Sequence, residues 1–221
     1  MRKKSKIIMA GLVLAAALAA CGNGGGTTTD KQNTQAEAEK NVEFSLGEIS
    51  DKVYTNKMLG VKIDLTSSGM LMANEEEMQL FDEGIKDRSD VSKVKAFVDG
   101  GNVFIDMYAY STTDTGTINI VLENMKKSGV DNIDKYIDAA IPQLEEEFKK
   151  SGFSDVKVEK SKVKLFGEEV TGINTVLSAE NVTQAQKQAF IKCGDYLATI
   201  TCAGENEMVA DEVMNMVEKS E

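Results

Sequence analysis

Apolar and polar residues alternate along several stretches of the chain with the period of two that is typical of half-buried β-strands. Four consecutive stretches of this kind, separated by short turns, cover 155–166, 169–179, 184–193 and 196–203. Two earlier pairs of alternating segments are joined by polar or glycine-containing turns, at 53–55 with 60–65 and at 103–111 with 117–123. The pattern therefore predicts two hairpins followed by a four-stranded meander.

Other stretches place apolar residues every three or four positions, as amphipathic helices do. The longest covers 132–151, and Gly152 is a natural residue to follow the helix end. Pro142 removes one backbone hydrogen bond from this helix, so we expect a kink or a break there. A last amphipathic helix is expected at 206–219, with its inward side formed by Val209, Val213, Met216 and Val217.

Two shorter helices are expected in the first half of the chain. Asn74 followed by Glu77 resembles a capping box, which predicts a helix from there to about Asp82. The apolar residues of segment 91–98 also fit helical spacing, with a strand over 94–98 as the alternative. Because no strand–helix–strand repeat occurs, the sheet should be mostly antiparallel.

The first apolar stretch of the chain differs from all of these. Segment 7–20 is continuously apolar and follows four basic residues, but it is shorter than the roughly 20 residues of a membrane-spanning helix. Basic start, apolar core and small residues at its end are typical of a signal peptide. We therefore expect the chain to be exported.

The end of this stretch, Leu18-Ala19-Ala20-Cys21, resembles the lipobox of bacterial lipoproteins. The resemblance implies cleavage before Cys21, a diacylglycerol group on its sulfur, and membrane lipid as a partner of the mature chain. An ordinary signal peptide with a chance cysteine is the alternative. The expected organisation is a signal peptide at 1–20, the lipidated Cys21 and a flexible tether at 21–50, and a single domain at 51–221.

The charge of the chain narrows its range of partners. The sequence contains 25 basic and 36 acidic residues, and removal of the four basic ones in the signal peptide leaves 21 against 36, or −15. A strongly acidic domain is a poor ligand for nucleic acid or for an anionic lipid surface. We expect neither as a partner.

The composition also narrows the chemistry. The chain has no histidine, which excludes Ser-His-Asp and Cys-His catalysis and the usual catalytic zinc sites, and it has no phosphate-binding glycine motif. We expect no catalytic centre, no metal and no cofactor. In the predicted 184–203 hairpin Cys193 lies opposite Tyr196 and Cys202 opposite Lys187, too far apart for a disulfide, so both cysteines should be buried thiols.

Strand 103–111 carries the most distinctive side chains. Strict alternation places Val103, Ile105, Met107 and Ala109 on one face, and Phe104, Asp106, Tyr108 and Tyr110 on the other. Tyrosines are frequent at protein interfaces, so we take Tyr54, Asp106, Tyr108 and Tyr110 as the candidate binding surface. The alternatives are tyrosines packed under a helix, and an Asp106 whose carboxylate serves only structural hydrogen bonds.

The order of elements resembles the PsbP-like family, an αβα sandwich. The segments that carry the resemblance are "VYTNKMLGVKIDL", "FIDMYAYS", the long helix into "KKSGFSDVKV", "VKLFGEEVTG" and "QAFIKCGDYLATIT". It implies an α+β fold with a mostly antiparallel sheet and helices packed on both faces, from Val53 to the end. One departure is the turn at 66–69, which is Thr-Ser-Ser-Gly where such domains often have a Pro-Gly-Trp-like turn.

Domains of this family mostly serve as accessory subunits. Together with the lipobox, this resemblance implies an extracytoplasmic, membrane-anchored binding or assembly module without catalytic activity, whose expected protein partner belongs to the cell envelope. The alternatives are a small-solute-binding lipoprotein and a hydrolase that uses carboxylates such as Asp106. The sequence indicates no oligomeric state.

Overall fold

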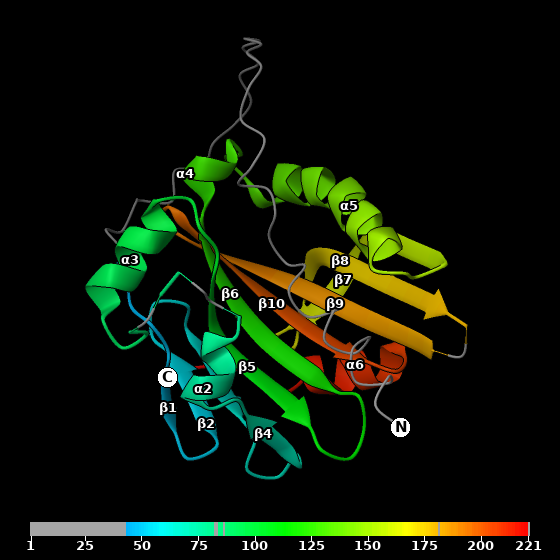
Figure 1. Ribbon diagram of the computed structural model, residues 1–221, viewed down its shortest axis with the longest axis horizontal. Helices are drawn as coiled ribbons and strands as arrows, with labels where there is room; N and C mark the ends of the chain where they lie inside the picture. Colours follow the sequence, from blue (N-terminus) through cyan, green and yellow to red (C-terminus); the bar gives the residue numbers. More distant parts are fainter. Residues whose placement is uncertain (1–42, 82–83, 86, 181, 221) are drawn as a thin grey trace.

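The computed structural model describes residues 43–81, 84–85, 87–180 and 182–220, and its fold is α+β with mostly antiparallel sheets (Figure 1). The larger sheet has seven strands in the order β4-β5-β6-β10-β9-β8-β7. Each of its neighbouring strands pairs antiparallel, which confirms the predicted kind of sheet. Its strands are β4 (Met70–Met72), β5 (Phe104–Ser111), β6 (Thr117–Asn124), β7 (Asp155–Leu165), β8 (Glu168–Ala179), β9 (Val182–Cys193) and β10 (Tyr196–Gly204).

The meander β7 to β10 and the β5–β6 hairpin lie where the alternating pattern predicted them. The register of the β9–β10 hairpin is also as predicted, with Cys193 opposite Tyr196 and Cys202 opposite Lys187. Both cysteines are free thiols, and Cys202 is fully buried. The short edge strand β4, which pairs with β5, was not predicted from the sequence.

A second sheet has four strands in the order β1-β2-β3-β11. The predicted early hairpin forms its centre, as β2 (Val53–Asn56) and β3 (Val61–Asp64). The two outer strands, β1 (Glu48–Ser50) and β11 (Val217–Lys219), were not predicted.

The end of the chain corrects the expected last helix. Helix α6 covers only Glu207–Met214, and the chain then continues into β11, where Val217 pairs with Ile63. Val217 is buried there, so its apolar side chain contributes to the core from a strand rather than from a helix. The prediction of a helix to 219 was wrong because the edge of β3 offered backbone hydrogen bonds that local periodicity does not reveal.

The early helices agree in kind with the prediction. Helix α2 (Glu75–Gln79) starts with the capping box of Asn74 and Glu77, but it is shorter than expected, and Asp82 lies outside the described residues. Helix α3 (Val91–Asp99) confirms the helical interpretation of this segment, so the alternative strand was wrong. A further short helix, α4 (Met125–Ser128), was not predicted.

Helix α5 (Ile133–Lys150) forms at the predicted place and continues through Pro142. A break at the proline was therefore the wrong alternative. Buried residues on both sides of the proline, including Tyr136 and Phe148, pack on the same face of the large sheet. This packing holds the two halves of the helix against one surface and offsets the hydrogen bond that the proline removes.

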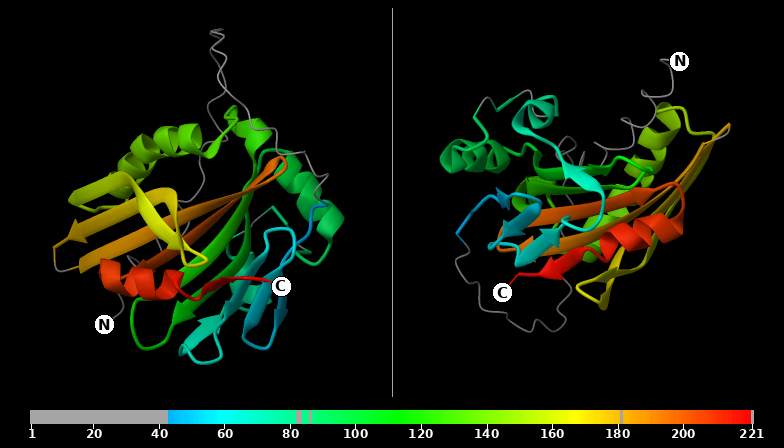
Figure 2. Two further views of the ribbon diagram at one scale, coloured as in Figure 1. Left: turned by 180° about the vertical axis from the view of Figure 1, so that it is seen from behind. Right: turned by 90° about the horizontal axis from the view of Figure 1, so that it is seen from below.

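The large sheet is covered differently on its two faces (Figure 2). Helix α5 packs on one face, against apolar side chains of β7 to β10, and α2 packs on the same face near β5. The four-stranded sheet and α6 cover the other face, where most of the core lies. Because a second sheet fills much of this face, the arrangement is richer in β-structure than the predicted pattern of helices on a single sheet.

The folded part of the chain begins earlier than expected. Phe44 is buried in the core, and its ring lies 4.8 Å from that of Tyr196. The expected boundary at residue 51 was therefore too late, because a single aromatic residue and a short strand anchor segment 44–50. Cys21 and the expected signal peptide lie outside the described residues. Within the described part of the chain, no helix is both long and apolar enough to span a membrane.

Candidate functional site

A β-bulge determines where Asp106 points. Ile105 pairs with Val121 and Met107 pairs with Ile120, so Asp106 is an extra residue in β5 that has no partner on β6. An extra residue shifts the alternation of side chains by one position. Asp106 consequently faces the four-stranded sheet, whereas Tyr108 lies on the opposite face.

This bulge corrects the faces expected for strand 103–111. Phe104, Met107 and Ala109 belong to the core between the two sheets, and Ile105 and Tyr108 belong to the cluster under α2. Strict alternation would have placed Phe104 and Tyr108 together. The four residues of the candidate binding surface are therefore divided into two pairs.

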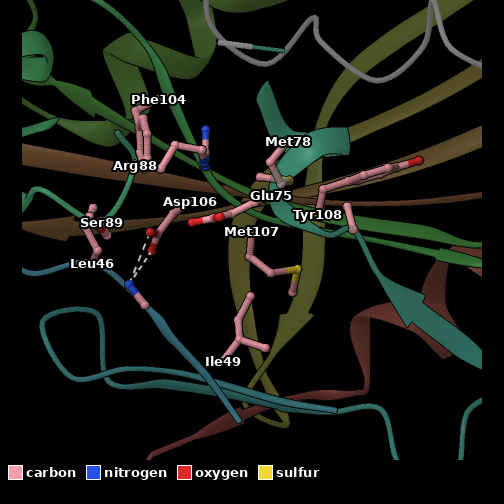
Figure 3. A pocket seen from close by; sticks show the side chains of 12 residues that line it. Leu46, Ile49, Glu75, Met78, Arg88, Ser89, Phe104, Asp106, Met107 and Tyr108 are labelled. Carbon is pink, nitrogen blue, oxygen red and sulfur yellow. Dashed lines mark hydrogen bonds between the residues drawn. The ribbon is translucent and has the colours of Figure 1, made fainter. Parts of the chain in front are cut away.

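The first pair, Tyr54 and Asp106, is buried, and the two side chains are hydrogen-bonded to each other. The Tyr54 hydroxyl donates to Asp106 Oδ2 at 2.6 Å, and the Asn56 side-chain amide donates to the same oxygen at 2.8 Å. The Gly47 backbone N–H lies 3.1 Å from Oδ1 and 3.0 Å from Oδ2 (Figure 3). The carboxylate thus joins β5 to β2 and to the segment that precedes β1.

Gly47 is required for this arrangement because it lies against the Tyr54 ring. A Cβ atom at Gly47 would lie 1.9 Å from Tyr54 Cε2, a distance that no side chain can occupy. Glycine here allows the backbone to approach the Tyr54 ring closely. The hydrogen bonds of Asp106 therefore depend on a residue whose importance the sequence pattern did not indicate.

Burial raises the pKa of both partners, Asp106 and Tyr54. The pKa of Asp106 is raised above its ordinary value by burial, and the hydrogen bonds from Tyr54, Asn56 and Gly47 partly oppose this rise. The pKa of Tyr54 is raised well above its ordinary value, first by burial and then by the charge of Asp106. Tyr54 consequently keeps its proton and remains a donor to the carboxylate.

The second pair, Tyr108 and Tyr110, lies beside α2 and is only partly buried. The Tyr108 ring lies 5.5 Å from the ring of Phe81 and 5.9 Å from that of Tyr110. The Tyr110 hydroxyl donates to Glu77 Oε1 at 3.2 Å, and burial is the main cause that raises the pKa of Tyr108 to about 12. Both tyrosines are neutral, and Tyr108 packs partly under α2, as the alternative interpretation predicted, whereas Tyr110 contacts the helix through its hydroxyl.

A hollow of about 200 Å³ is lined by Asp106 and Tyr108, one member of each pair, where β5, α2 and the segment leading into β1 meet (Figure 3). Its apolar lining consists of Leu46, Ile49, Ala73, Met78, Phe104 and Met107. Its polar lining includes Glu75, Arg88, Ser89 and Asp106. Sequence reasoning identified Asp106 and Tyr108, which also line it, but not the hollow itself, because its walls come from segments far apart in the chain.

Arg88 forms one wall of the hollow and was not identified from the sequence. Its guanidinium donates to the Ile105 carbonyl and lies 4.3 Å from the centre of the Phe104 ring. Its positive charge also opposes the rise in the pKa of Asp106. Arg88 therefore balances part of the buried negative charge and stacks on the core at the same time.

A second buried carboxylate, Glu123, lies on β6 under α5 and was also missed. It is only 4% exposed, and it accepts a hydrogen bond from the Tyr136 hydroxyl. Burial raises its pKa to about 7, and the bond from Tyr136 partly opposes that rise. The sequence offered one indication of its burial. Glu123 lies two residues from Val121 in a strand, so both side chains face the same side of the sheet, and helices covering that side would bury both.

The described residues contain no group of three or more cysteine, aspartate or glutamate side chains placed to hold a metal ion. No protein-family model matches this chain, and no curated protein is similar to it in sequence.

Proposed function

We propose that the protein is a lipid-anchored, extracytoplasmic binding module that has no catalytic centre. The anchor is Cys21, and the evidence for it is the lipobox with its basic start and apolar core. A strongly acidic domain on a tether suits the solvent-exposed side of a membrane, where anionic lipid repels it. The partner proposed for it is a protein of the cell envelope.

The observation that carries the non-catalytic part of this proposal is the state of Asp106. A general base must reach a proton of the substrate through a free oxygen lone pair. Three donors from inside the protein already bond to the oxygens of Asp106, and the residue is only 9% exposed, so burial limits the access of a substrate to the remaining lone pair. Its role is to hold the two sheets together beside the hollow.

The size of the hollow weighs against the solute-binding alternative. Pockets for small molecules usually measure about 300–1,000 Å³, and the hollow has about 200 Å³. Such a volume suits one side chain of a protein partner better than a whole solute. A protein-binding module therefore accounts for the hollow more simply than a transport protein does.

We also propose that the fold is a variant of the PsbP-like αβα sandwich. The packing of α5 on one face of the large sheet and of α6 on the other supports this assignment. The four-stranded sheet beside α6 is an addition to that arrangement. Accessory roles known for the family agree with a binding module, but they carry only the weight of a shared architecture.

Two measurements test the proposal. Broad hydrolase screening of the purified protein should give no turnover above background, and reproducible turnover that Asp106→Asn abolishes would support the carboxylate-hydrolase alternative instead. Cys21→Ser should move the protein from the membrane fraction to the soluble fraction without changing its unfolding transition. If this variant stays with the membrane after a high-salt wash, the lipid anchor is wrong.

A further inference from the structure

The groups that line the hollow are not equally available to a ligand. Asp106 is buried and accepts hydrogen bonds from Gly47, Tyr54 and Asn56, and the Ser89 hydroxyl donates to Asp87 at 2.7 Å. Arg88 is held on the Phe104 ring and the Ile105 carbonyl. The part of the hollow that is most available to a ligand is therefore its apolar surface.

Two apolar residues line that surface from different elements. Ile49 on β1 lines the hollow while half of its surface, 50%, remains exposed. Met78 on α2 lines the hollow from another element and is buried (Figure 3). A flexible methionine and an exposed isoleucine form a surface that can adapt to an inserted apolar side chain.

Three charged side chains line the hollow, and Arg88 balances the buried carboxylate of Asp106, so Glu75 is left as the unbalanced charge. Glu75 lines the hollow at the first residue of α2 and is exposed. The whole chain carries a net charge of −11. Charge complementarity therefore favours a partner with basic side chains next to the apolar one.

We propose that this hollow is the docking point for an extended, basic segment of a partner protein, which inserts one large apolar side chain between Ile49 and Met78 and places a lysine or arginine against Glu75. This inference rests on the proposed function and names the chemistry of its partner. Small, well-packed hollows that receive one anchor side chain commonly dominate the affinity of protein interfaces.

The proposal is tested with the full mature lipoprotein in a non-ionic detergent and with short fluorescent peptides. The probe is Gly-Lys-Lys-Leu-Lys-Lys-Gly, and its controls carry serine in place of leucine or glutamate in place of each lysine. Fluorescence anisotropy should show that the leucine peptide binds about tenfold tighter than the serine peptide, and that the glutamate peptide does not bind. Equal affinity for the leucine and serine peptides would overturn the anchor.

Two substitutions locate the binding. Ile49→Arg, at a half-exposed position, should weaken the leucine peptide about tenfold, whereas the matched Val182→Arg should leave its affinity within about twofold. Val182 is 41% exposed and lies on β9, three strands from β5 in the sheet, so it controls for added charge alone. Equal effects of the two variants would place the binding elsewhere and reject the hollow.

A charge reversal tests the role of Glu75. The Glu75→Lys variant should no longer bind the basic peptide and should bind the acidic one. An unchanged preference would remove Glu75 from the proposal.

If sedimentation shows the wild-type protein alone to be a dimer that Ile49→Arg dissociates, the occupant is a second copy and the basic partner is rejected. Each of these failures leaves the membrane fractionation and the turnover screen unaffected, so the proposed function stands or falls separately.

Discussion

Tyr54 and Asp106 show how a single buried charge organises this protein. The carboxylate lies on a bulge in one sheet, and its donors come from β2 of the other sheet and from the segment before β1. A buried carboxylate that loses one of its donors retains the full cost of desolvation. Losing a donor therefore costs more free energy, through the unpaired carboxylate left buried, than forming the hydrogen bond contributes.

We predict that Tyr54→Phe lowers the free energy of unfolding by about 1–3 kcal/mol, because it removes only the hydroxyl that donates to Asp106. The matched control is Tyr110→Phe, which removes a hydrogen bond to Glu77 at a partly exposed position and should cost less than about 0.5 kcal/mol. Urea unfolding of the two variants measures both values. Equal losses would contradict a structural role that is specific to Asp106.

The raised pKa of Glu123 predicts a pH-dependent contribution to stability. Because its pKa is raised from 4.5 to about 7, the folded state holds this proton more tightly than the unfolded state does. Its contribution to stability is therefore complete below pH 4.5 and is lost as the pH rises to about 7. At 1.36 kcal/mol per pKa unit the whole effect is about 3 kcal/mol.

We predict that Glu123→Gln removes this part of the pH dependence. Glutamine stays neutral, so the variant and the wild type should have similar free energies of unfolding near pH 4.5, and the variant should become the more stable one above pH 7. Chemical unfolding at a series of pH values gives the comparison, in which the other titrating groups cancel. Parallel curves for the two proteins across this range would show that Glu123 titrates normally.

The candidate residues could be selected from the sequence, but their arrangement could not. Asp106 stood out as an acid among aromatic residues, and Tyr54 as a tyrosine in a strand, and the structure brings these two together. Tyr108 was separated from them by a bulge, which one extra residue creates and which leaves no mark in an alternating pattern. Arg88 was missed because its partners, Phe104 and Ile105, are distant in the chain.

At the scale of elements, α6 depends on a buried cation. Lys187 on β9 has a side chain that is only 10% exposed, and its amino group lies 3.1 Å from Glu207 and 3.6 Å from Asp211 on α6. The two carboxylates are about half exposed, so they can be hydrated without the lysine. The lysine cannot be hydrated without leaving the core.

This asymmetry predicts unequal effects of removing either side of the ion pair. Lys187→Met should change the free energy of unfolding by less than about 1 kcal/mol, because an apolar side chain of similar length suits the site. The double change Glu207→Gln and Asp211→Asn should lower it by at least about 2 kcal/mol, because an uncompensated cation then stays buried. Thermal unfolding distinguishes the two, and a larger loss from Lys187→Met would reverse the account.

Elements with a strong local pattern were predicted well, and elements formed by distant pairing were not. The β9–β10 hairpin has a two-residue turn and long alternating strands, so its register followed from the sequence. Strand β11 has three residues, and its position depends on the edge of β3, which lies more than 150 residues earlier. Helical spacing of Val213 and Val217 continued through the point where tertiary pairing took over.

At the scale of the whole molecule, both sheets have edges that need protection from other chains. Strand β7 is the longest edge, and it carries Lys157, Lys160, Lys162 and Lys164. Lysines on an edge strand oppose pairing with a second chain. The edges β1 and β4 are short instead, and Ile49 of β1 lines the hollow. A partner is therefore expected to dock through side chains at this end rather than by extending the large sheet at β7.

The proposed function depends most on where the chain is attached. The measurement is the intact mass of the protein extracted from the membrane fraction, followed by sequencing of its first peptide by tandem mass spectrometry. We predict a chain that begins at Cys21 and carries a diacylglycerol group on that residue, because segment 18–21 resembles a lipobox, which would direct cleavage between Ala20 and Cys21. A chain that begins elsewhere, or one that begins at an unmodified Cys21, would contradict the proposal of a lipid-anchored binding module.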